Sequence, residues 1–145
     1  MVGFDPVAVK APFLLRCAAL CIDYIVLLAV PVLGLALTQL MGGKSGPPGA
    51  MTWLLTTLVA LSNFIILPLL ASQTVGKMLA GLRITCSDGS PASVVAILLR
   101  NVVGYLVTAL TLGIGFLIAG LTPTGRALHD YISGTMVIYA KRRRL

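Results

Sequence analysis

The sequence predicts an all-α membrane protein with two full transmembrane helices, a third apolar helical segment and a small cytoplasmic β element. Hydrophobic residues make up 58% of the chain and charged residues only 10%, whereas a soluble domain carries roughly 25% charged residues. The mean hydropathy is +1.01, so the chain has too few polar groups to cover a surface in water. We treat residues 1–145 as a single domain, which has room for three or four crossings.

The first apolar run, residues 13–41, is longer than the ~20 residues that cross a hydrocarbon core. Pro6 and Pro12 precede it and are expected to break any early helix. The run contains Asp23 and exceeds the length of a signal-peptide core, so a cleaved secretory signal does not fit. We therefore interpret this run as a retained span.

A second span is predicted over residues 51–70. It follows a loop, residues 41–50, in which Gly, Ser and Pro dominate. Trp53 stands near its start, a position that tryptophan often takes at the membrane interface. The first two spans therefore return the chain to the side on which it began.

Residues 72–93 form the longest polar stretch, and its Lys77 and Arg83 place it in the cytoplasm by the charge rule. Within it, residues 82–86 are typical of a short strand, and Asp88-Gly89 indicates a tight turn. A helix is expected to begin near Ser93. Residues 135–139 are β-branched and aromatic, which predicts a second strand.

The third apolar run, residues 94–121, leaves two topologies open. Lys10 and Arg16 predict a cytoplasmic N-terminus, and a single third span would then place Arg126 and the basic tail 141–145 outside. A re-entrant helical hairpin that breaks near Gly113 and Gly115 would keep them inside, provided that protein buries its bend. It would also let the two predicted strands pair on one side of the membrane.

The basic balance of the chain, a net charge of +7, indicates a membrane surface as partner and not a nucleic acid. The charges stand at the ends of apolar runs and are not interleaved with aromatic residues. The terminal Lys141-Arg142-Arg143-Arg144 is expected to contact anionic headgroups. Because three or four helices make a thin wall for a pathway, we also expect a homo-oligomer or a larger membrane complex.

Charged side chains inside apolar runs are costly, which makes them candidates for function. Arg16 and Asp23 are seven residues apart, so they share a helix face at a separation of about 10 Å and each needs its own partner. The sequence does not choose among the candidates, which are Asp130, Arg100, Arg83 and Arg126. The set can serve as an ion or proton path, or as a structural network that fixes how the helices dock.

His129 is the single histidine of the chain and precedes Asp130. A nearby carboxylate would raise its pKa, which would suit a proton relay, whereas the alternative is a capping or headgroup-contacting histidine. The sequence offers no nucleophile with a base, no metal cluster and no glutamate. We therefore expect no catalytic residue, no bound metal, no cofactor and no enzymatic activity.

Four groups of short strings follow one another along the chain: Arg16-x-x-Ala19-x-x-Ile22-Asp23, the segment from Gln73 to Ile84, Asp88-Gly89-Ser90-Pro91 with Leu99-Arg100-Asn101, and Leu128-His129-Asp130-x-x-x-Gly134-Thr135-x-Val137. In this order they resemble the RDD family of bacterial membrane proteins, named for one Arg and two Asp. By that resemblance Arg16, Asp23 and Asp130 are the name-giving residues. The resemblance also makes Gly76, Lys77 and Arg83 part of a loop motif.

The resemblance implies a transport role, and sodium/proton antiport is attributed to some members. Our leading expectation is a multi-pass protein of the bacterial inner membrane that takes part in ion or small-solute transport, with Arg16, Asp23 and Asp130 lining the path. The alternative is a non-transporting accessory or assembly subunit of a larger membrane complex. In that case the polar residues are structural and the strands offer a docking edge.

Overall fold

The computed structural model describes residues 6–43 and 46–140. In chain order it contains α1 (Pro6–Val9), α2 (Phe13–Leu40), α3 (Ala50–Leu61), the π-helical turn η1 (Ser62–Ile66), α4 (Leu67–Ala71), α5 (Val75–Leu79), β1 (Leu82–Cys86), α6 (Val94–Leu110), α7 (Ile114–Leu121), α8 (Leu128–Ile132) and β2 (Thr135–Tyr139). The predicted fold class is confirmed, since the described part has two long apolar helices, a shorter third one and a small sheet.

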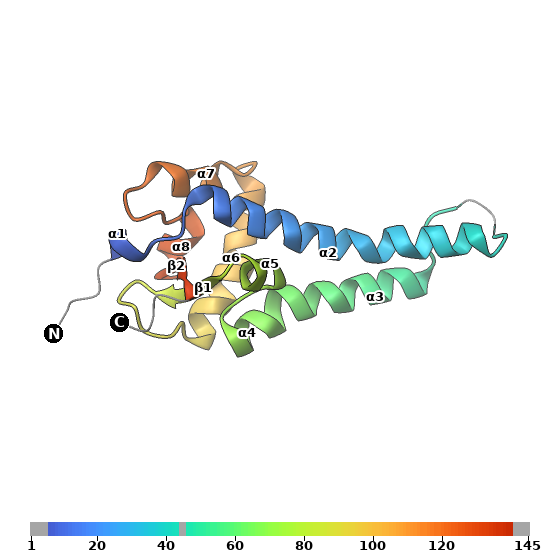
Figure 1. Ribbon diagram of the computed structural model, residues 1–145, viewed down its shortest axis with the longest axis horizontal. Coiled ribbons are helices and arrows are strands. Elements are labelled where there is room, and N and C mark those ends of the chain that lie inside the picture. The colour runs from blue at the N-terminus through green and yellow to red at the C-terminus, as the bar shows by residue number, and fades with distance from the viewer. Residues whose placement is uncertain (1–5, 44–45, 141–145) are drawn as a thin grey trace.

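Helices α2 and α3 form a hairpin that projects away from the rest of the molecule (Figure 1). The helical stretches 13–40 and 50–71 are long and apolar enough to cross a bilayer, and only 6% and 11% of their most apolar windows are buried by protein. Helix α3 contains no buried residue at all. Apolar surface on this scale is unfavourable in water, so a bilayer is its natural solvent.

The second span bends through a π-helical turn just before Pro68. Proline has no N–H to donate to the carbonyl four residues earlier, which here belongs to Phe64. The side-chain amide of Asn101, on α6, donates to that carbonyl instead. Neighbouring helices commonly satisfy a freed carbonyl in this way inside membranes, and the contact fixes α6 against the base of the hairpin.

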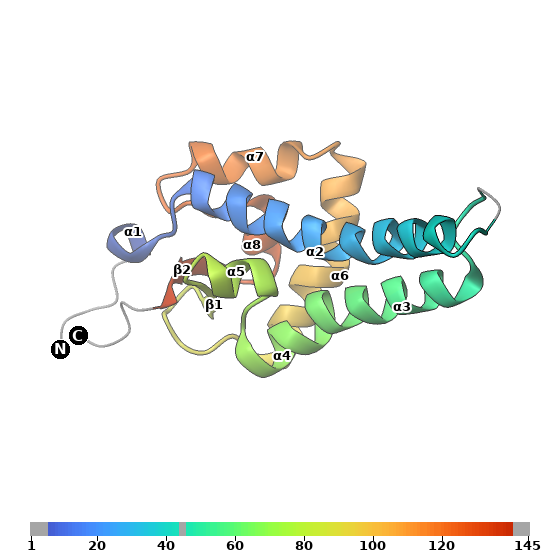
Figure 2. The same cartoon turned by 45° about the vertical axis from the view of Figure 1, so that its right-hand side comes forward.

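The third apolar run is not one continuous helix, because it breaks into α6 and α7 near Gly113, as the hairpin topology requires. Gly113 has a φ of 86°, a left-handed conformation that favours glycine, whereas Gly115 lies inside α7. Helix α7 then lies beside the start of α2, where the rings of Phe116 and Phe13 are 5.5 Å apart. Helix α6 runs steeply across the hairpin (Figure 2).

Both predicted strands are confirmed at the predicted residues. They pair antiparallel, with Leu82 opposite Tyr139 and Cys86 opposite Thr135. The N-terminal arm joins the same sheet, since the backbone N–H of Ala11 donates to the carbonyl of Val137 at 3.0 Å. The N-terminal arm, β1 and β2 therefore lie together at one end of the hairpin, around a small core of Ala11, Ala19, Leu82 and Val137.

Three local expectations need comment. Pro6 does not prevent an early helix but begins α1, a position that suits its fixed φ. Helix α5 was not expected in the polar stretch, and it starts where the Thr74 hydroxyl accepts from the N–H of Lys77 at 3.3 Å. Helix α6 begins after Ser93, as predicted, with a similar cap from that side chain. The basic tail 141–145 lies outside the described residues.

Candidate functional site

Asp23 is buried on α2, with 1% of its surface exposed, and its carboxylate is held by three donors. The amide of Asn63 donates to it at 2.9 Å, and the hydroxyl of Thr74 does so at 2.6 Å. The backbone N–H of Gly76 is the third donor, at 2.7 Å. Asp23 therefore joins the π-helical turn and the start of α5 to α2, and it forms no ion pair with a described residue.

Gly76 allows α5 to come this close to α2. A Cβ added at Gly76 would lie 1.9 Å from the carbonyl oxygen of Ala19 and 2.9 Å from Cγ of Asp23. Such distances are far below van der Waals contact, so any side chain here would push α5 away. The Asn63 side chain completes the joint, because its amide oxygen accepts from the N–H of Val75 at 2.8 Å.

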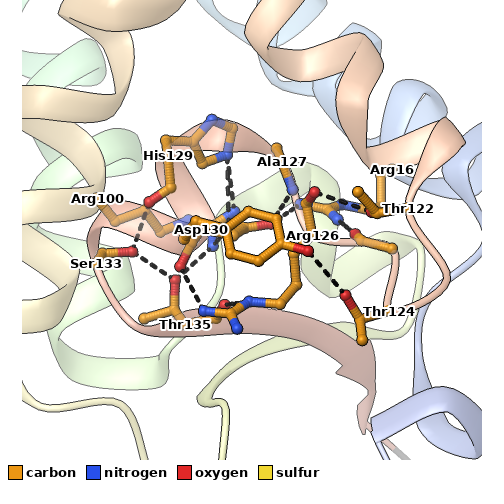
Figure 3. A network of polar contacts seen from close by, with 12 residues as sticks. Arg16, Arg100, Thr122, Thr124, Arg126, Ala127, His129, Asp130, Ser133 and Thr135 are labelled. Carbon is orange, nitrogen blue, oxygen red and sulfur yellow. Dashed lines mark hydrogen bonds and ion pairs between the residues drawn. The ribbon is translucent and has the colours of Figure 1, made fainter.

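Asp130 on α8 is the centre of a second cluster and is completely buried. Arg16 of α2 donates to its Oδ2 at 2.5 Å, and Arg100 of α6 pairs with its Oδ1. Burial alone would raise the pKa of Asp130, but Arg100 and Arg16 hold that pKa well below its ordinary value. The carboxylate is therefore ionised at neutral pH and ties three helices together (Figure 3).

Further contacts fix this cluster in place. The Oδ2 of Asp130 accepts from the N–H of Ala127 at 3.0 Å, which caps the start of α8. Arg16 also donates to the carbonyl of Gly125. Arg100 donates to the hydroxyl of Thr135 at 3.0 Å, which links α6 to the start of β2 (Figure 3). Because the oxygens and the donors engage one another, the cluster is a rigid joint.

His129 lies at the edge of the same cluster. Its ring stacks on Phe116 with the centroids 6.3 Å apart, and its Nε2 is 3.5 Å from the guanidinium of Arg100. Burial, together with the charge of Arg100, lowers the pKa of His129 to about 3, although Asp130 acts in the opposite direction. The ring is therefore neutral at physiological pH. Asp130 raises the pKa of His129, as expected, but burial and Arg100 outweigh it, so the net shift is downward and a proton relay loses its support.

A cavity of about 200 Å³ adjoins the cluster and is lined by residues of α2, α5, α6, α7 and α8 and of the turn before α7. Three cations and a histidine face it together with polar, aromatic and apolar groups, namely Arg16, Leu20, Tyr24, Lys77, Arg100, Asn101, Gly104, Gly113, Phe116 and His129. Lys77 differs from the two arginines, since no carboxylate of a described residue lies within 4.0 Å of its ammonium. Burial, followed by the charge of Arg100, lowers the pKa of Lys77 to about 7.

The structure thus places the predicted polar residues in two hydrogen-bonded clusters and in the wall of the cavity. We call the clusters the Asp23 joint and the Asp130 joint. Asp23 and Asp130, both expected to line a path, are instead enclosed by donors. Of the candidate partners, Arg100 turns to Asp130, and Arg126 donates to the Asp130 backbone carbonyl at 3.1 Å. Arg83 of the expected loop motif lies on β1, away from both joints, where its buried Nε has no partner among the described residues.

Sequence reasoning missed the roles of Asn63, Thr74 and Asn101. Asn63 and Asn101 are amides inside apolar runs, and that cost alone marks them as groups with fixed partners. Thr74 precedes α5 as a helix cap, a signal that is visible only if a helix is expected there. Within residues 6–43 and 46–140, no group of three His, Cys, Asp or Glu side chains is placed to hold a metal ion.

Comparison with known proteins gives three matches and one negative result. The model of the RDD family matches residues 10–134. An uncharacterized protein, YckC of Bacillus subtilis (strain 168), is 36% identical over 135 residues, which cover 90% of this chain and 85% of that protein. An uncharacterized membrane protein of the same organism, YteJ, is 30% identical over 87 residues, which cover 59% of this chain and 52% of that protein. No solved structure matches.

Proposed function

This chain belongs to the RDD family, and from that premise we propose that it takes part in moving a small anionic solute across the bacterial inner membrane. The cavity beside the Asp130 cluster is the proposed solute site. Its walls come from five helices and the turn before α7, so a change in the packing of any of them would open or close it. The bilayer setting follows from the family and from the two exposed apolar helices.

The cavity itself is the observation that carries this proposal. A purely structural network packs its polar groups against one another, as Asp23 and its three donors do. Lys77 instead faces an open volume of about 200 Å³ without a carboxylate partner in the described part. A cation that is withdrawn from water is costly unless a counter-charge joins it, so a cavity lined by such a cation supports an anion site.

The signs of the lining charges favour an anion over a cation. Arg16, Lys77 and Arg100 face the cavity, whereas the carboxylate of Asp130 is engaged by two arginines. A sodium ion would need oxygen ligands from the wall, and no carboxylate residue is among the lining residues. The neutral state of His129 at physiological pH also gives no support to a proton path.

The orientation that we propose places the sheet end of the molecule in the cytoplasm. Lys10, Lys77, Arg83 and Arg126 all lie at that end, and the positive-inside rule assigns such an end to the cytoplasmic side. We also propose that the protein works as an oligomer or within a larger complex. Helix α3, which buries no residue within the chain, offers apolar surface to a neighbouring helix or to lipid.

The second candidate is an accessory or assembly subunit that transports nothing itself. The saturated Asp23 and Asp130 joints favour it, because they explain why these charges are present without any ligand. The two candidates differ in what the cavity does. An accessory subunit requires the joints but not Lys77, whereas a solute site requires both.

Flux through liposomes that contain the purified protein alone separates the candidates. We expect uptake of labelled inorganic phosphate or acetate above that of empty liposomes, and a loss of most of it in Lys77→Gln. Lys10→Gln is the matched control, because Lys10 donates to the carbonyl of Pro123 and does not line the cavity. Anion uptake equal to that of empty liposomes would overturn the transport proposal, and sodium flux without anion flux would overturn the assigned charge.

A further inference from the structure

A second hollow, largely apolar, lies next to the cationic cavity. Its volume is about 470 Å³, and its walls come from α2, α3, the π-helical turn and α6 through Tyr24, Leu27, Trp53, Thr56, Thr57, Ala60, Leu61, Phe64, Ile65, Asn101 and Val102. Tyr24 and Asn101 line both spaces. The two hollows are therefore neighbours, with Tyr24 and Asn101 at their boundary.

The groove follows the hairpin for about the depth of one membrane leaflet. Its lining residues on the second span extend from Ile65 to Trp53, twelve residues apart. At a rise of ~1.5 Å per residue that is about 18 Å, a little over half of the ~30 Å hydrocarbon thickness. An extended alkyl chain that starts at Tyr24 would thus run the length of the groove.

The cavity lies where the charged end of the molecule meets the apolar hairpin. Between Asp23 and Lys77 the chain carries a single charged residue, Lys44, in the loop that joins α2 to α3. The described hairpin beyond Asp23 is therefore free of charge, while the cationic cavity lies at its base. Charged side chains concentrate at the level of lipid headgroups, so this geometry puts the cavity at headgroup depth.

The basic side chains around the cavity differ in their partners. Its wall carries three basic side chains, Arg16, Lys77 and Arg100. Arg16 and Arg100 share the single carboxylate of Asp130, whereas the carboxylate of Asp23 is held by uncharged donors. Lys77 has no carboxylate within 4.0 Å among the described residues, so its protonated form can take an anionic partner.

We propose that the cavity and the groove together bind one anionic phospholipid, with its phosphate against Lys77 and one acyl chain along the groove. This inference rests on the proposed function in one respect, that the cavity is the ligand site, and it names the ligand class. The charge of the headgroup complements the protonated Lys77, and the chain covers apolar side chains between α2, α3 and α6. The boundary at Tyr24 and Asn101 holds the junction of head and chain.

The test is lipid binding to the purified full chain, followed by native mass spectrometry from detergent. Phosphatidylglycerol, phosphatidylcholine and inorganic phosphate are the three probes. We expect phosphatidylglycerol to bind about tenfold more tightly than phosphatidylcholine, since a charge-assisted contact is worth about one decade in affinity. Free phosphate is expected to bind more weakly than phosphatidylglycerol because it leaves the groove empty.

Three variants locate the lipid. Lys77→Gln removes the cation, and Ala60→Trp fills the groove without changing any charge; both are expected to weaken phosphatidylglycerol binding by about tenfold. Lys10→Gln is expected to bind as the parent does. Lys77→Arg, which keeps the charge, should retain most of the preference. Circular dichroism and thermal unfolding of Lys77→Gln itself check that its loss of lipid binding is not a loss of folding.

Two results would overturn the inference. One is equal binding of the two phospholipids, with free phosphate binding at Lys77; the proposed anion site would then stand without a lipid. The other is a phosphatidylglycerol preference that neither Lys77→Gln nor Ala60→Trp changes. Specific lipid binding at both positions, together with no solute or lipid movement in liposomes, would support the inference while contradicting the proposed transport.

Discussion

Arg16 and Asp130 lie 114 residues apart in the sequence, yet the guanidinium of one donates to the carboxylate of the other at 2.5 Å in the interior. This pair joins the first helix of the hairpin to the short helix that precedes β2. Arg100 shares the same carboxylate from α6. The carboxylate of Asp130 therefore holds together three helices that are distant in the sequence. Its removal should lower the stability of the whole fold.

Replacing Asp130 by Asn should destabilise the protein by about 3 kcal/mol or more, because it leaves two buried guanidinium groups without their counter-ion. The free energy of unfolding can be measured in detergent through the fluorescence of Trp53, the single tryptophan. Asp88→Asn is the control, since Asp88 is exposed and caps only its own turn through Ser90. Equal stability of the two variants would contradict the assigned role of Asp130.

Gly76→Ala should cost at least about 2 kcal/mol, because the new methyl group would overlap the carbonyl of Ala19 and separate α5 from α2. Gly49→Ala serves as the matched control, as a Cβ there meets nothing within 4 Å and its φ of −67° suits alanine. Thermal unfolding of both variants checks this. If Gly76→Ala melted at the parent temperature, the close contact between α5 and α2 would be absent from the protein.

The pH dependence of stability should carry a signature of Lys77. Its pKa is lowered to about 7 in the folded state, mainly by burial and then by Arg100, from an ordinary value of 10.5. Between these values the unfolded chain binds more protons than the folded one, so this group makes stability rise as the pH rises from about 7 to about 10. The groups that act on Lys77 are Arg16, Asp23, Arg100 and Asp130, and His129 shares its cavity.

A comparison of the parent with Lys77→Gln isolates that contribution. The difference between their unfolding free energies should change across pH 7 to 10 in the stated direction. A difference that stays constant over this range would show that the Lys77 pKa is not lowered. His129 acts in a separate window, because its pKa is lowered to about 3 and its contribution rises between that pH and about 6.5.

The pairing of β1 with β2 makes a prediction about topology. Residues 82–86 and 135–139 are hydrogen-bonded neighbours, and the arm at Lys10 bridges to Ile138, so all three must lie on one side of the bilayer. Reporters fused before Met1, inserted between Asp88 and Gly89 or fused after Leu145 should all give a cytoplasmic signal. A reporter inserted at Lys44 should give an external one. If the first three reporters gave signals from different sides of the membrane, the sheet could not form.

Much of the fold follows from the sequence because lipid imposes simple rules on it. A bilayer requires apolar runs of about 20 residues, so α2 and the span from Ala50 to Ala71 were predicted nearly to the residue. The two strands stood out through β-branched residues between turn signals. Helix α5 is not predicted, because a five-residue segment that includes Gly76 is typical of a loop. The hydrogen bond from the Gly76 N–H to Asp23, which stabilises the start of this helix, is not visible in the sequence.

The arrangement of the site was less accessible to sequence reasoning. From the signs of the charges, Arg100 was a candidate partner of Asp23. In the structure the Asp23 carboxylate instead accepts hydrogen bonds from an amide, a hydroxyl and a backbone N–H. The sequence indicates that Asp130 raises the pKa of His129, but it does not reveal the larger effects of burial and of Arg100, which is distant in the sequence. Burial and contacts between residues that are distant in the sequence leave no local pattern in a single sequence.

The protonation of Lys77 in lipid nanodiscs is the most direct test of a cationic cavity that takes an anionic headgroup. Nuclear magnetic resonance of the ¹⁵N-labelled lysine ammonium groups, with Lys77→Gln to assign the signal, gives the pKa of this side chain. The account predicts a pKa near 7 in phosphatidylcholine and a higher one in phosphatidylglycerol, because a bound anion favours the charged form. A pKa near 10.5 in both membranes, with Lys77 and Lys10 behaving alike, would contradict it.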